Sequence, residues 1–186
     1  MARPRSEEAR QKAIDTTQAL LAEGGIDAFT IDAVAKRSGV AKTTLYRHWG
    51  SGNELLVHSL DCQVEQIPAP DKGSLEADLI EMFTVMATIM NDPGTRQLIL
   101  EMMGAAAKDP DLAAVKNAMV AERHRPLEDI VLRAVDRGEI PPVNLEHATL
   151  FIEGPFMARV MMGRGLIDIE EIPSIIRMII RGLGGD

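Results

Sequence analysis

Residues 30–54, TIDAVAKRSGVAKTTLYRHWGSGNE, constrain the fold more than any other stretch of this 186-residue chain. Thr30 is placed to cap a short helix over residues 31–38, and Gly39 ends that helix, because a glycine adopts the left-handed conformation of a tight turn without Cβ strain. A second helix over residues 41–49 follows at once. Two short helices joined by so tight a turn are typical of a helix-turn-helix, whose second helix enters the major groove of DNA.

The second helix is predicted to have one buried side and one polar surface. Leu45 and Trp49 lie four residues apart and share the buried side. No acidic side chain interrupts the rest of the helix, whose side chains donate hydrogen bonds or reach phosphates and base edges. A small helical protein can contain helix, glycine and helix without binding DNA, but the cap, the turn and the acid-free surface together favour a DNA-binding helix. The residues that we expect to contact DNA are Thr30, Lys42, Thr43, Thr44, Tyr46, Arg47 and His48.

Two further helices accompany this motif. A helix from Ser6 to Glu23 precedes it, with glutamates near the positively polarised first turn. A capping box of Ser51 and Glu54 starts another helix, which extends to about Gln66. The sequence therefore predicts a helix-turn-helix domain over residues 1–50, a connecting helix over residues 51–66 and a second domain over residues 67–186.

Charge is divided unevenly along the chain, whose formal net charge is −8. Residues 1–60 carry eight Lys or Arg against seven Asp or Glu, whereas residues 61–186 carry twelve against 21. The division places the expected nucleic-acid surface in the N-terminal part. Four basic residues near the start either form an arm that contacts phosphates or the minor groove, or belong to a solubilising tail: Arg3, Arg5, Arg10 and Lys12.

Residues 30–55 resemble the signature of the TetR (tetracycline-repressor) family of transcriptional regulators, with GVAKTTLYRHW standing where the family has its turn and recognition helix. The resemblance implies a homodimer that binds a palindromic operator in double-stranded DNA and releases it when a small molecule occupies the C-terminal domain. The family usually places a lysine that contacts the DNA backbone near the start of the next helix. This chain has Gly52 followed by Asn53 there, so that phosphate contact is not carried over.

Everything after Ser74 is patterned as helices, with little sign of strand alternation. Helices are expected over residues 74–90 and 95–107, and then from Asp109, with Pro126 kinking or splitting the third. Two more follow from Asn144 and around residues 172–183. The chain is therefore predicted to be all-α, with an N-terminal three-helix helix-turn-helix domain and a C-terminal helical domain for ligand binding and dimerisation.

The last two helices are apolar on more than one side, which predicts either a domain core or a four-helix interface between two copies. The segment HATLFIEGPFMARVMMGRG also resembles the penultimate helix of TetR-family ligand domains, which favours the homodimer. The side chains expected at the interface are Phe151, Phe156, Met157, Val160, Ile172, Ile176, Ile179 and Ile180.

Methionine is concentrated in the C-terminal part, where all ten internal methionines lie between Met82 and Met178. Flexible, polarisable methionines suit a cavity that closes around irregular apolar ligands, although they also fill ordinary cores. Three polar residues in apolar stretches would either orient a ligand or face solvent or an ion-pair partner. The residues expected to bind a small apolar ligand are Met82, Phe83, Met86, Glu101, Met102, Met119, His124 and Glu153.

Other classes of function find little support. The chain has no Gly-rich phosphate loop, no G-x-S-x-G elbow and no H-E-x-x-H motif, so we expect neither catalysis nor a cofactor. One cysteine, Cys62, and four scattered histidines predict no metal site. Because neither a membrane span nor a signal peptide is evident, we expect a cytoplasmic protein without a membrane partner. The alternative function is a DNA-binding structural or chromosome-organising protein on the same fold, with a protein partner and no small ligand.

Overall fold

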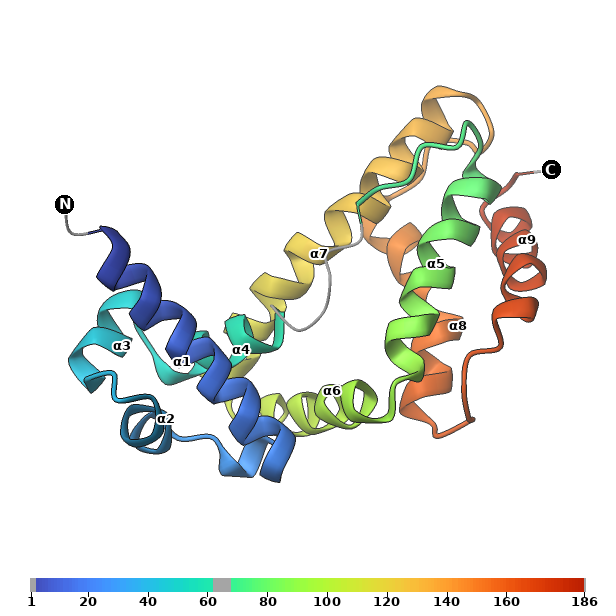
Figure 1. Ribbon diagram of the computed structural model, residues 1–186. Helices are drawn as coiled ribbons and strands as arrows, with labels where there is room; N and C mark the ends of the chain where they lie inside the picture. Colours follow the sequence, from blue (N-terminus) through green and yellow to red (C-terminus); the bar gives the residue numbers. More distant parts are fainter. Residues whose placement is uncertain (1–2, 62–67, 186) are drawn as a thin grey trace. The chain divides into compact units, whose positions relative to one another are not determined.

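The computed structural model describes residues 3–61 and 68–185, with side chains from residue 6 onward in those ranges. Every regular element among these residues is an α-helix or a short 3-10 helix, which confirms the predicted all-α fold (Figure 1). The chain divides into two compact units. The first unit combines residues 1–65 with residues 97–120, and the second combines residues 66–96 with residues 121–186.

The helix-turn-helix lies in the first unit between two flanking helices. Its elements in chain order are α1 (Arg3–Gly24), the 3-10 helix η1 (Ile26–Ala28), α2 (Ile31–Ser38), α3 (Lys42–Trp49) and α4 (Gly52–Asp61). α1 packs against both α2 and α4. One apolar core joins them and keeps the two helices of the motif at a fixed angle. Its buried members are Ala13, Ile14, Val34, Val40, Leu45, Trp49 and Leu55.

The first unit also contains a segment from the C-terminal part of the chain. Residues 97–120 comprise the later part of α6 (Pro93–Ala106) and the beginning of α7 (Pro110–Asp136). The predicted division into residues 1–50, 51–66 and 67–186 follows the order of the chain and remains a prediction, whereas the units group residues by packing, which the apolar stripe of a helix does not reveal. A second core fastens the segment to α1 and α4, and its buried members are Leu21, Leu56, Val57, Met102, Ala106 and Leu112.

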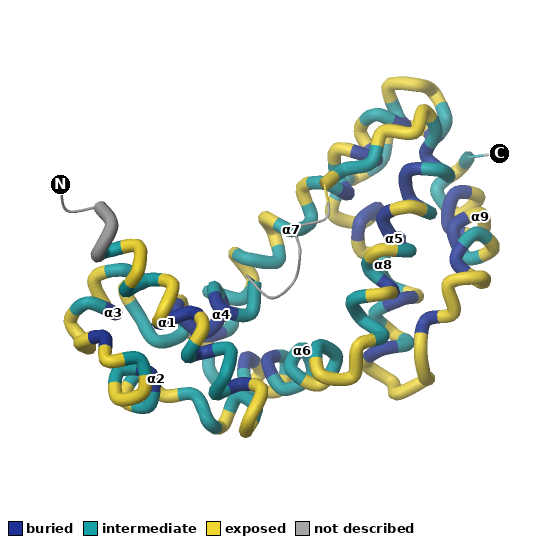
Figure 2. The backbone as a smooth tube through the Cα atoms, viewed as in Figure 1, coloured by how far each residue is buried: buried dark blue, intermediate teal, exposed yellow. Residues whose placement is uncertain are grey.

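The second unit is built around α5 (Leu75–Asn91), α8 (Leu145–Met161) and α9 (Ile172–Gly182), with the short η2 (Ile169–Glu171) before α9. α5 packs against α9. The rings of Phe83 and Phe156 stack at its centre, with centroids 4.3 Å apart and planes inclined by 28°. Figure 2 shows how the buried residues of α9 follow one side of that helix while its other side is exposed.

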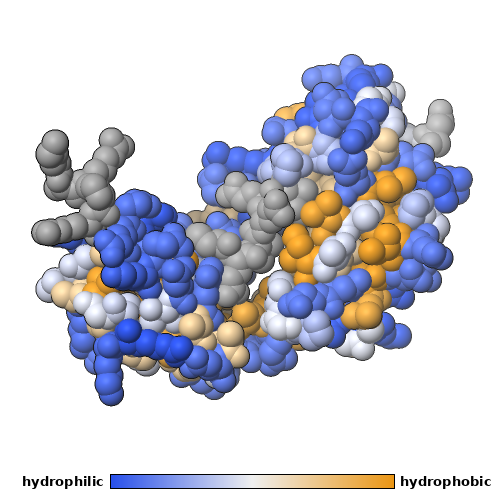
Figure 3. All heavy atoms as spheres, in the orientation of Figure 1, coloured by the Kyte–Doolittle hydropathy of each residue, from blue (hydrophilic) through white to orange (hydrophobic). Residues whose placement is uncertain are grey.

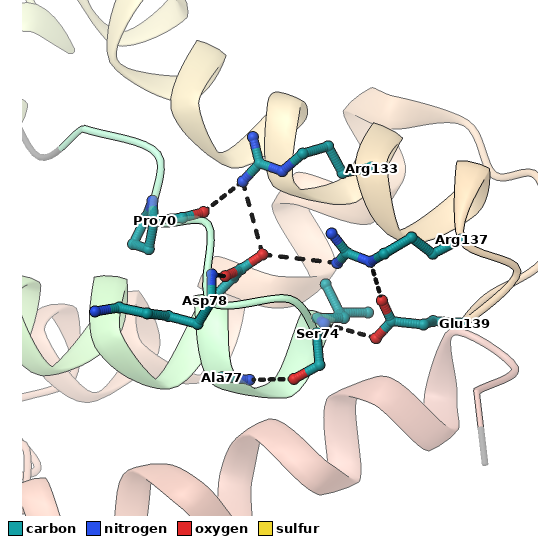
Figure 4. A network of polar contacts seen from close by, with 9 residues as sticks. Pro70, Ser74, Ala77, Asp78, Arg133, Arg137 and Glu139 are labelled. Atoms are coloured by element: carbon teal, nitrogen blue, oxygen red, sulfur yellow. Dashed lines mark hydrogen bonds and ion pairs between the residues drawn. The ribbon is translucent and has the colours of Figure 1, made fainter.

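A buried carboxylate joins the start of α5 to the end of α7 in the second unit (Figure 4). Asp78 is fully buried and accepts a hydrogen bond from the backbone amide of Lys72 at 2.5 Å. The guanidinium groups of Arg133 and Arg137 lie 3.7 and 3.6 Å from its other oxygen. Glu139 pairs with Arg137 and accepts a hydrogen bond from the first amide of α5. A buried charge is tolerated only with such partners, so the network fixes the segment before α5 against α7.

Some helix limits differ from the prediction. α1 begins at Arg3 rather than Ser6, whose hydroxyl lies 3.3 Å from His48 Nε2 instead of capping the helix. α7 is one helix through Pro126, so the predicted split of this segment is wrong, whereas a kink stays a prediction. Its buried inner side, which includes Leu127 and Ile130, holds the helix together across the missing backbone donor. α4 is described to Asp61, so the predicted end of the connecting helix at Gln66 lies, like Cys62, outside the described residues.

Candidate nucleic-acid interface

The turn between α2 and α3 has the predicted chemistry. The Thr30 hydroxyl accepts a hydrogen bond from the Ala33 amide at 3.0 Å and so caps α2. Gly39 takes the left-handed conformation, with φ of 73°, and its amide bonds to the Ala35 carbonyl. Val40 is buried directly after it. The cap, the glycine and the buried valine together determine where α3 begins.

α3 buries its apolar side and exposes a polar one, as expected. Leu45 and Trp49 retain only 1% and 6% of their exposed area. Tyr46 is 48% exposed, although it is aromatic. An exposed tyrosine on an otherwise polar helix suits contact with bases or sugars, because its ring is apolar and its hydroxyl forms hydrogen bonds. Of the other residues expected to contact DNA, Lys42, Thr43 and Arg47 are exposed and Thr44 is half-buried.

His48 has a different place from the other predicted DNA contacts. It is half-buried, and its Nε2 lies within hydrogen-bond distance of the Ser6 hydroxyl on α1. Its ring also lies 5.5 Å from that of Trp49, measured between centroids. These contacts make His48 a link between α3 and α1, whereas the sequence pattern indicated only that it lies beside the buried stripe.

A second contact between α1 and the following helices was not predicted. Arg10 donates a hydrogen bond to His58 Nε2 on α4 at 2.8 Å, and the His58 ring lies 6.2 Å from Trp49 at the end of α3. Burial, reinforced by the charge of Arg10, lowers the pKa of His58, so its imidazole is uncharged and accepts this hydrogen bond. No local pattern signals the pair, because its members lie 48 positions apart.

The basic residues near the chain start divide into two groups. Arg3 and Arg5 belong to α1, but their side chains lie outside the described part. Lys12 pairs with Glu8 at 2.8 Å, one helical turn away, and Arg10 pairs with Glu7 at 3.3 Å as well as with His58. Both described cations are thus in local pairs on α1, and the arm remains a prediction.

The cations of α2 and α3 also differ in their partners. Lys42, the first residue of α3, forms an ion pair with Asp32 in the first turn of α2. Arg37 forms two parallel hydrogen bonds of 2.6 Å with Glu23 on α1, and these raise the pKa of Arg37 and lower that of Glu23. Arg47 has no carboxylate within ion-pair distance in the described part of the chain. It is therefore an exposed cation of α3 without a described carboxylate partner.

The residues expected to bind a ligand lie in both units. Met82 and Phe83 are buried in the second unit, and Met86 is partly buried on the same helix. Met102 and Met119 instead belong to the apolar core that fastens residues 97–120 to the helix-turn-helix. Their helical spacing indicated an apolar environment for both, but the choice of partner depends on the tertiary fold.

The Glu101 carboxylate accepts hydrogen bonds from other residues of the first unit. One carboxylate oxygen accepts a hydrogen bond from the Ile26 amide at 2.9 Å, and the other accepts one from Gln97 Nε2 at 2.8 Å. These two bonds, that from Gln97 being the stronger influence, lower the pKa of Glu101. Both oxygens therefore have a protein donor, and a ligand contact of this carboxylate remains a prediction.

His124 and Glu153 form a pair in the second unit, between α7 and α8. His124 Nε2 lies 3.0 Å from a carboxylate oxygen of Glu153, and each side chain keeps less than a quarter of its exposed area. The hydrogen bond to Glu153 raises the pKa of His124, although burial opposes this. The two side chains are thus partners of each other, and a ligand contact of either one remains a prediction.

Most of the residues expected at a dimer interface are buried in the second unit itself. A side chain without exposed area has no surface to offer a second copy, so the isoleucine-rich side of α9 is core, and Phe156 and Val160 on α8 are core too. Met157 is partly buried, whereas Phe151 is 49% exposed. The large apolar side chains that α8 and α9 do expose, with Met162 directly after α8, are Leu150, Phe151, Met161, Met162 and Met178.

No group of three or more histidine, cysteine, aspartate or glutamate side chains in residues 6–61 and 68–185 is arranged to hold a metal ion. No described helix is long and apolar enough to cross a membrane.

Known proteins share both parts of this arrangement. Residues 13–58 match the family described as bacterial regulatory proteins, tetR family, and residues 69–179 match the tetracyclin repressor-like C-terminal domain. The transcriptional regulator YdeS of Bacillus subtilis (strain 168) is 25% identical over 185 residues, which cover 97% of this chain and 92% of YdeS. The regulator AqdR of Rhodococcus erythropolis is 28% identical over 132 residues, which cover 70% of this chain and 63% of AqdR.

Solved structures agree with these matches. The crystal structure of the TetR family transcription regulator SCO0332 superposes with a TM-score of 0.75 at 25% identity, covering 94% of this chain and 98% of that one. FadR from Bacillus subtilis shares the fold at 18% identity, with a TM-score of 0.70 and coverage of 92% and 98%. These relatives are named as transcriptional regulators, a class that is not enzymatic. With family matches over its helix-turn-helix and over more than half of its length, the chain belongs to the TetR family of DNA-binding transcriptional regulators.

Proposed function

We propose that this regulator is a homodimeric repressor that binds a palindromic operator and leaves it when a small apolar molecule binds its C-terminal part. One observation carries the DNA-reading part, namely the exposed, acid-free side of α3 with Tyr46 and Arg47. The repressor KstR of Rhodococcus jostii (strain RHA1) supports the direction of regulation, at 33% identity over 112 residues that cover 58% of this chain and 51% of KstR.

Self-association is supported by the apolar side chains that α8 and α9 expose. Leu150 and Phe151 are 56% and 49% exposed on α8, and Met178 is 62% exposed on α9. Exposed apolar side chains gathered on neighbouring helices favour contact with another protein surface, and a two-fold axis satisfies both copies at once. Phe151 also lines an open hollow of about 380 Å³ together with Leu183 at the end of α9. In this proposal the buried isoleucines of α9 belong to the core beneath the interface and do not contact the second copy.

The ligand is proposed to bind the second unit beside α5. Apolar residues gather on the surface over α5 in Figure 3, and an open hollow of about 530 Å³ there is lined by Ile80, Thr84 and Val85 among others. A volume of this order accommodates a small organic molecule. Two proteins of the same fold have crystal structures as ligand complexes: FadR with stearoyl-CoA and EbrR with proflavin, which superpose with TM-scores of 0.70 and 0.59. They support a small-molecule sensor.

Release would follow from the different affinities of the ligand for two arrangements of the dimer. DNA selects the arrangement in which the recognition helices of the two copies match half-sites about 34–36 Å apart or a multiple of that distance. A ligand that prefers another arrangement lowers operator affinity by the difference between its two binding free energies.

The packing beside α5 favours a second candidate, a DNA-binding structural protein without a small ligand. Phe83 keeps 1% of its exposed area and Met82 keeps 7%. The space between α5 and the interior of the unit is therefore occupied by protein side chains. A ligand that enters there must displace Phe83 from Phe156.

Two measurements test these proposals. Selection of bound fragments from genomic DNA should yield palindromic operators, and a gel-shift assay should show their release by the inducer. A panel of lipophilic compounds should contain some that raise the melting temperature, because a ligand that binds only the folded state stabilises it. Val85→Trp, which fills the hollow beside α5, should abolish that shift and keep operator binding. If no compound in a broad panel stabilises the protein, the ligand-free structural protein replaces the sensor.

A further inference from the structure

The start of the recognition helix concentrates positive charge. Lys42 is the first residue of α3, whose first turn contains no acidic residue and whose preceding residue, Ala41, provides no side-chain cap. The free amides and the helix dipole therefore add to the charge of the ammonium group. Such a helix start attracts DNA phosphates regardless of sequence.

Asp32 is placed to cancel that charge. It lies in the first turn of α2, which Thr30 caps, and its carboxylate forms the ion pair with the Lys42 ammonium. Both side chains are largely exposed, with 72% and 52% of their areas accessible. An exposed pair is weak in water, so a phosphate can replace the carboxylate as the partner of Lys42. The carboxylate nevertheless remains beside the phosphate and opposes it.

Arg47 provides a contrast on the same helix, since no described carboxylate pairs with it. The two cations of α3 therefore differ in their surroundings. Lys42 at the helix start has a carboxylate partner, whereas Arg47 in the last turn has none that is described and can interact with DNA. Residues 1–60, which contain the helix-turn-helix, are also nearly neutral, with eight cations against seven anions.

We infer that Asp32 positions and neutralises Lys42 so that the recognition helix binds the DNA backbone weakly wherever no operator is present. This inference rests on the proposed DNA-reading side of α3. A genome offers far more non-operator sites than operators, so weak binding at each non-operator site matters for regulation. A helix-turn-helix that is attracted less strongly to the DNA backbone spends less time on non-operator DNA. It therefore stays available for the sequence that Arg47 and Tyr46 read.

The test measures binding of the full-length protein to a labelled duplex of random sequence at several salt concentrations. Asp32→Asn should tighten binding at low salt, because the released Lys42 neutralises one more phosphate. It should also steepen the dependence of log affinity on log salt by about 0.9 for each helix-turn-helix that is bound. Between about 50 and 200 mM salt, this steeper slope makes the loss of affinity about 3.5-fold larger than in wild type for each bound helix-turn-helix. An unchanged slope would overturn the inference.

The matched control is Asp27→Asn. Asp27 is an exposed carboxylate in η1 of the same unit and forms no ion pair with any described side chain, so its replacement changes the net charge equally without releasing a cation. It should keep the wild-type slope. If Asp27→Asn and Asp32→Asn steepen the slope alike, net charge alone explains the effect and the inference is wrong.

A double variant identifies the cation. Asp32→Asn combined with Lys42→Gln should restore the wild-type slope, because the released ammonium is gone. A slope that stays as steep as that of Asp32→Asn would mean that another cation is responsible. Thermal melts accompany each variant, because Asp32 also favours the positive end of α2. A melting change alone does not alter a salt slope.

Arg47→Ala separates the failure of this inference from failure of the proposed DNA-reading surface. If Arg47→Ala weakens operator binding while Asp32→Asn has no effect on the slope, only the role of Asp32 is refuted. If neither variant affects DNA binding, α3 is not the reading helix and both proposals fail.

Discussion

The Glu101 carboxylate on α6 accepts a hydrogen bond from the Ile26 amide, 75 positions earlier in the chain and 2.9 Å away. Gly25, immediately before Ile26, has φ of 64°, and a Cβ at this position would collide with the Glu101 carboxylate. A residue of the C-terminal part thus caps the turn that precedes Thr30 and the helix-turn-helix. The positive φ favours glycine at position 25, and a Cβ there would displace the Glu101 carboxylate from this position.

Glu101→Gln should lower the free energy of unfolding by about 1 kcal/mol, because the Ile26 amide loses a charged acceptor. Chemical denaturation followed by circular dichroism measures the change. Asp129→Asn, which removes an exposed carboxylate on α7, should leave the unfolding free energy within about 0.5 kcal/mol of wild type. Equal stabilities of wild type and Glu101→Gln would show that the negative charge of this acceptor contributes nothing.

The contribution of Glu101 should also depend on pH. Its pKa is lower in the folded protein than in the unfolded chain, so the stabilisation is present above the ordinary glutamate range and is lost as pH falls through the folded pKa. The difference in unfolding free energy between wild type and Glu101→Gln should therefore be constant at neutral pH and shrink in acid. A difference that is independent of pH down to acid unfolding would contradict this assignment.

Arg47→Ala should reduce operator affinity by about 1 to 3 kcal/mol per half-site and leave the melting temperature unchanged, because the side chain is exposed and has no described carboxylate partner. Tyr46→Phe should weaken binding in the same assay through loss of its hydroxyl. Gel shifts with the selected operator measure both variants. Wild-type affinity for both would remove α3 from the DNA interface.

Phe151→Glu and Ile176→Glu should have different consequences, although both residues were expected at the dimer interface. Phe151 is 49% exposed, so its variant should stay folded and become monomeric. Ile176 is fully buried, so its variant should unfold the second unit through an unpaired buried charge. Light scattering gives the mass and circular dichroism gives the folding. A folded, monomeric Ile176→Glu, or a stable monomer of the unmodified protein, would contradict this assignment.

The His124–Glu153 pair should stabilise the second unit by about 1 kcal/mol at mildly acidic pH. The pKa of His124 is raised above its ordinary value of about 6.5, so the contribution is complete below that value and disappears as pH rises through the folded pKa. Melting temperatures of wild type and Glu153→Gln should differ at mildly acidic pH and converge in alkaline solution. A gap that widens with pH would reverse the sign and refute the pairing.

The candidate DNA site could be predicted largely from the sequence, because its determinants are local. The Thr30 cap and the positive φ of Gly39 depend on neighbours within four residues, and the spacing of Leu45 and Trp49 determines which side of α3 is buried. His48 was the exception. Its position beside the buried stripe was evident, but its partner Ser6 comes from α1, 42 positions away.

The C-terminal part was less predictable, because helical periodicity shows that a side is buried and does not identify what covers it. Met86 and Met102 have the same apolar character in the sequence, yet Met86 lies in the second unit and Met102 lies in the core beside α1 and α4. For the same reason the isoleucines of α9 suggested an interface, whereas α5 covers them within one chain.

The sequence by itself therefore determined the helical fold, the helix-turn-helix and the polar side of α3, since caps, turns and periodicity act over one or two helical turns. Only the tertiary structure decided that residues 97–120 join the helix-turn-helix, that Glu101 caps its approach, and that Asp32 meets Lys42. Those contacts join residues far apart in the chain or on separate helices. They form because packing two apolar surfaces against each other brings together polar groups that no local pattern relates.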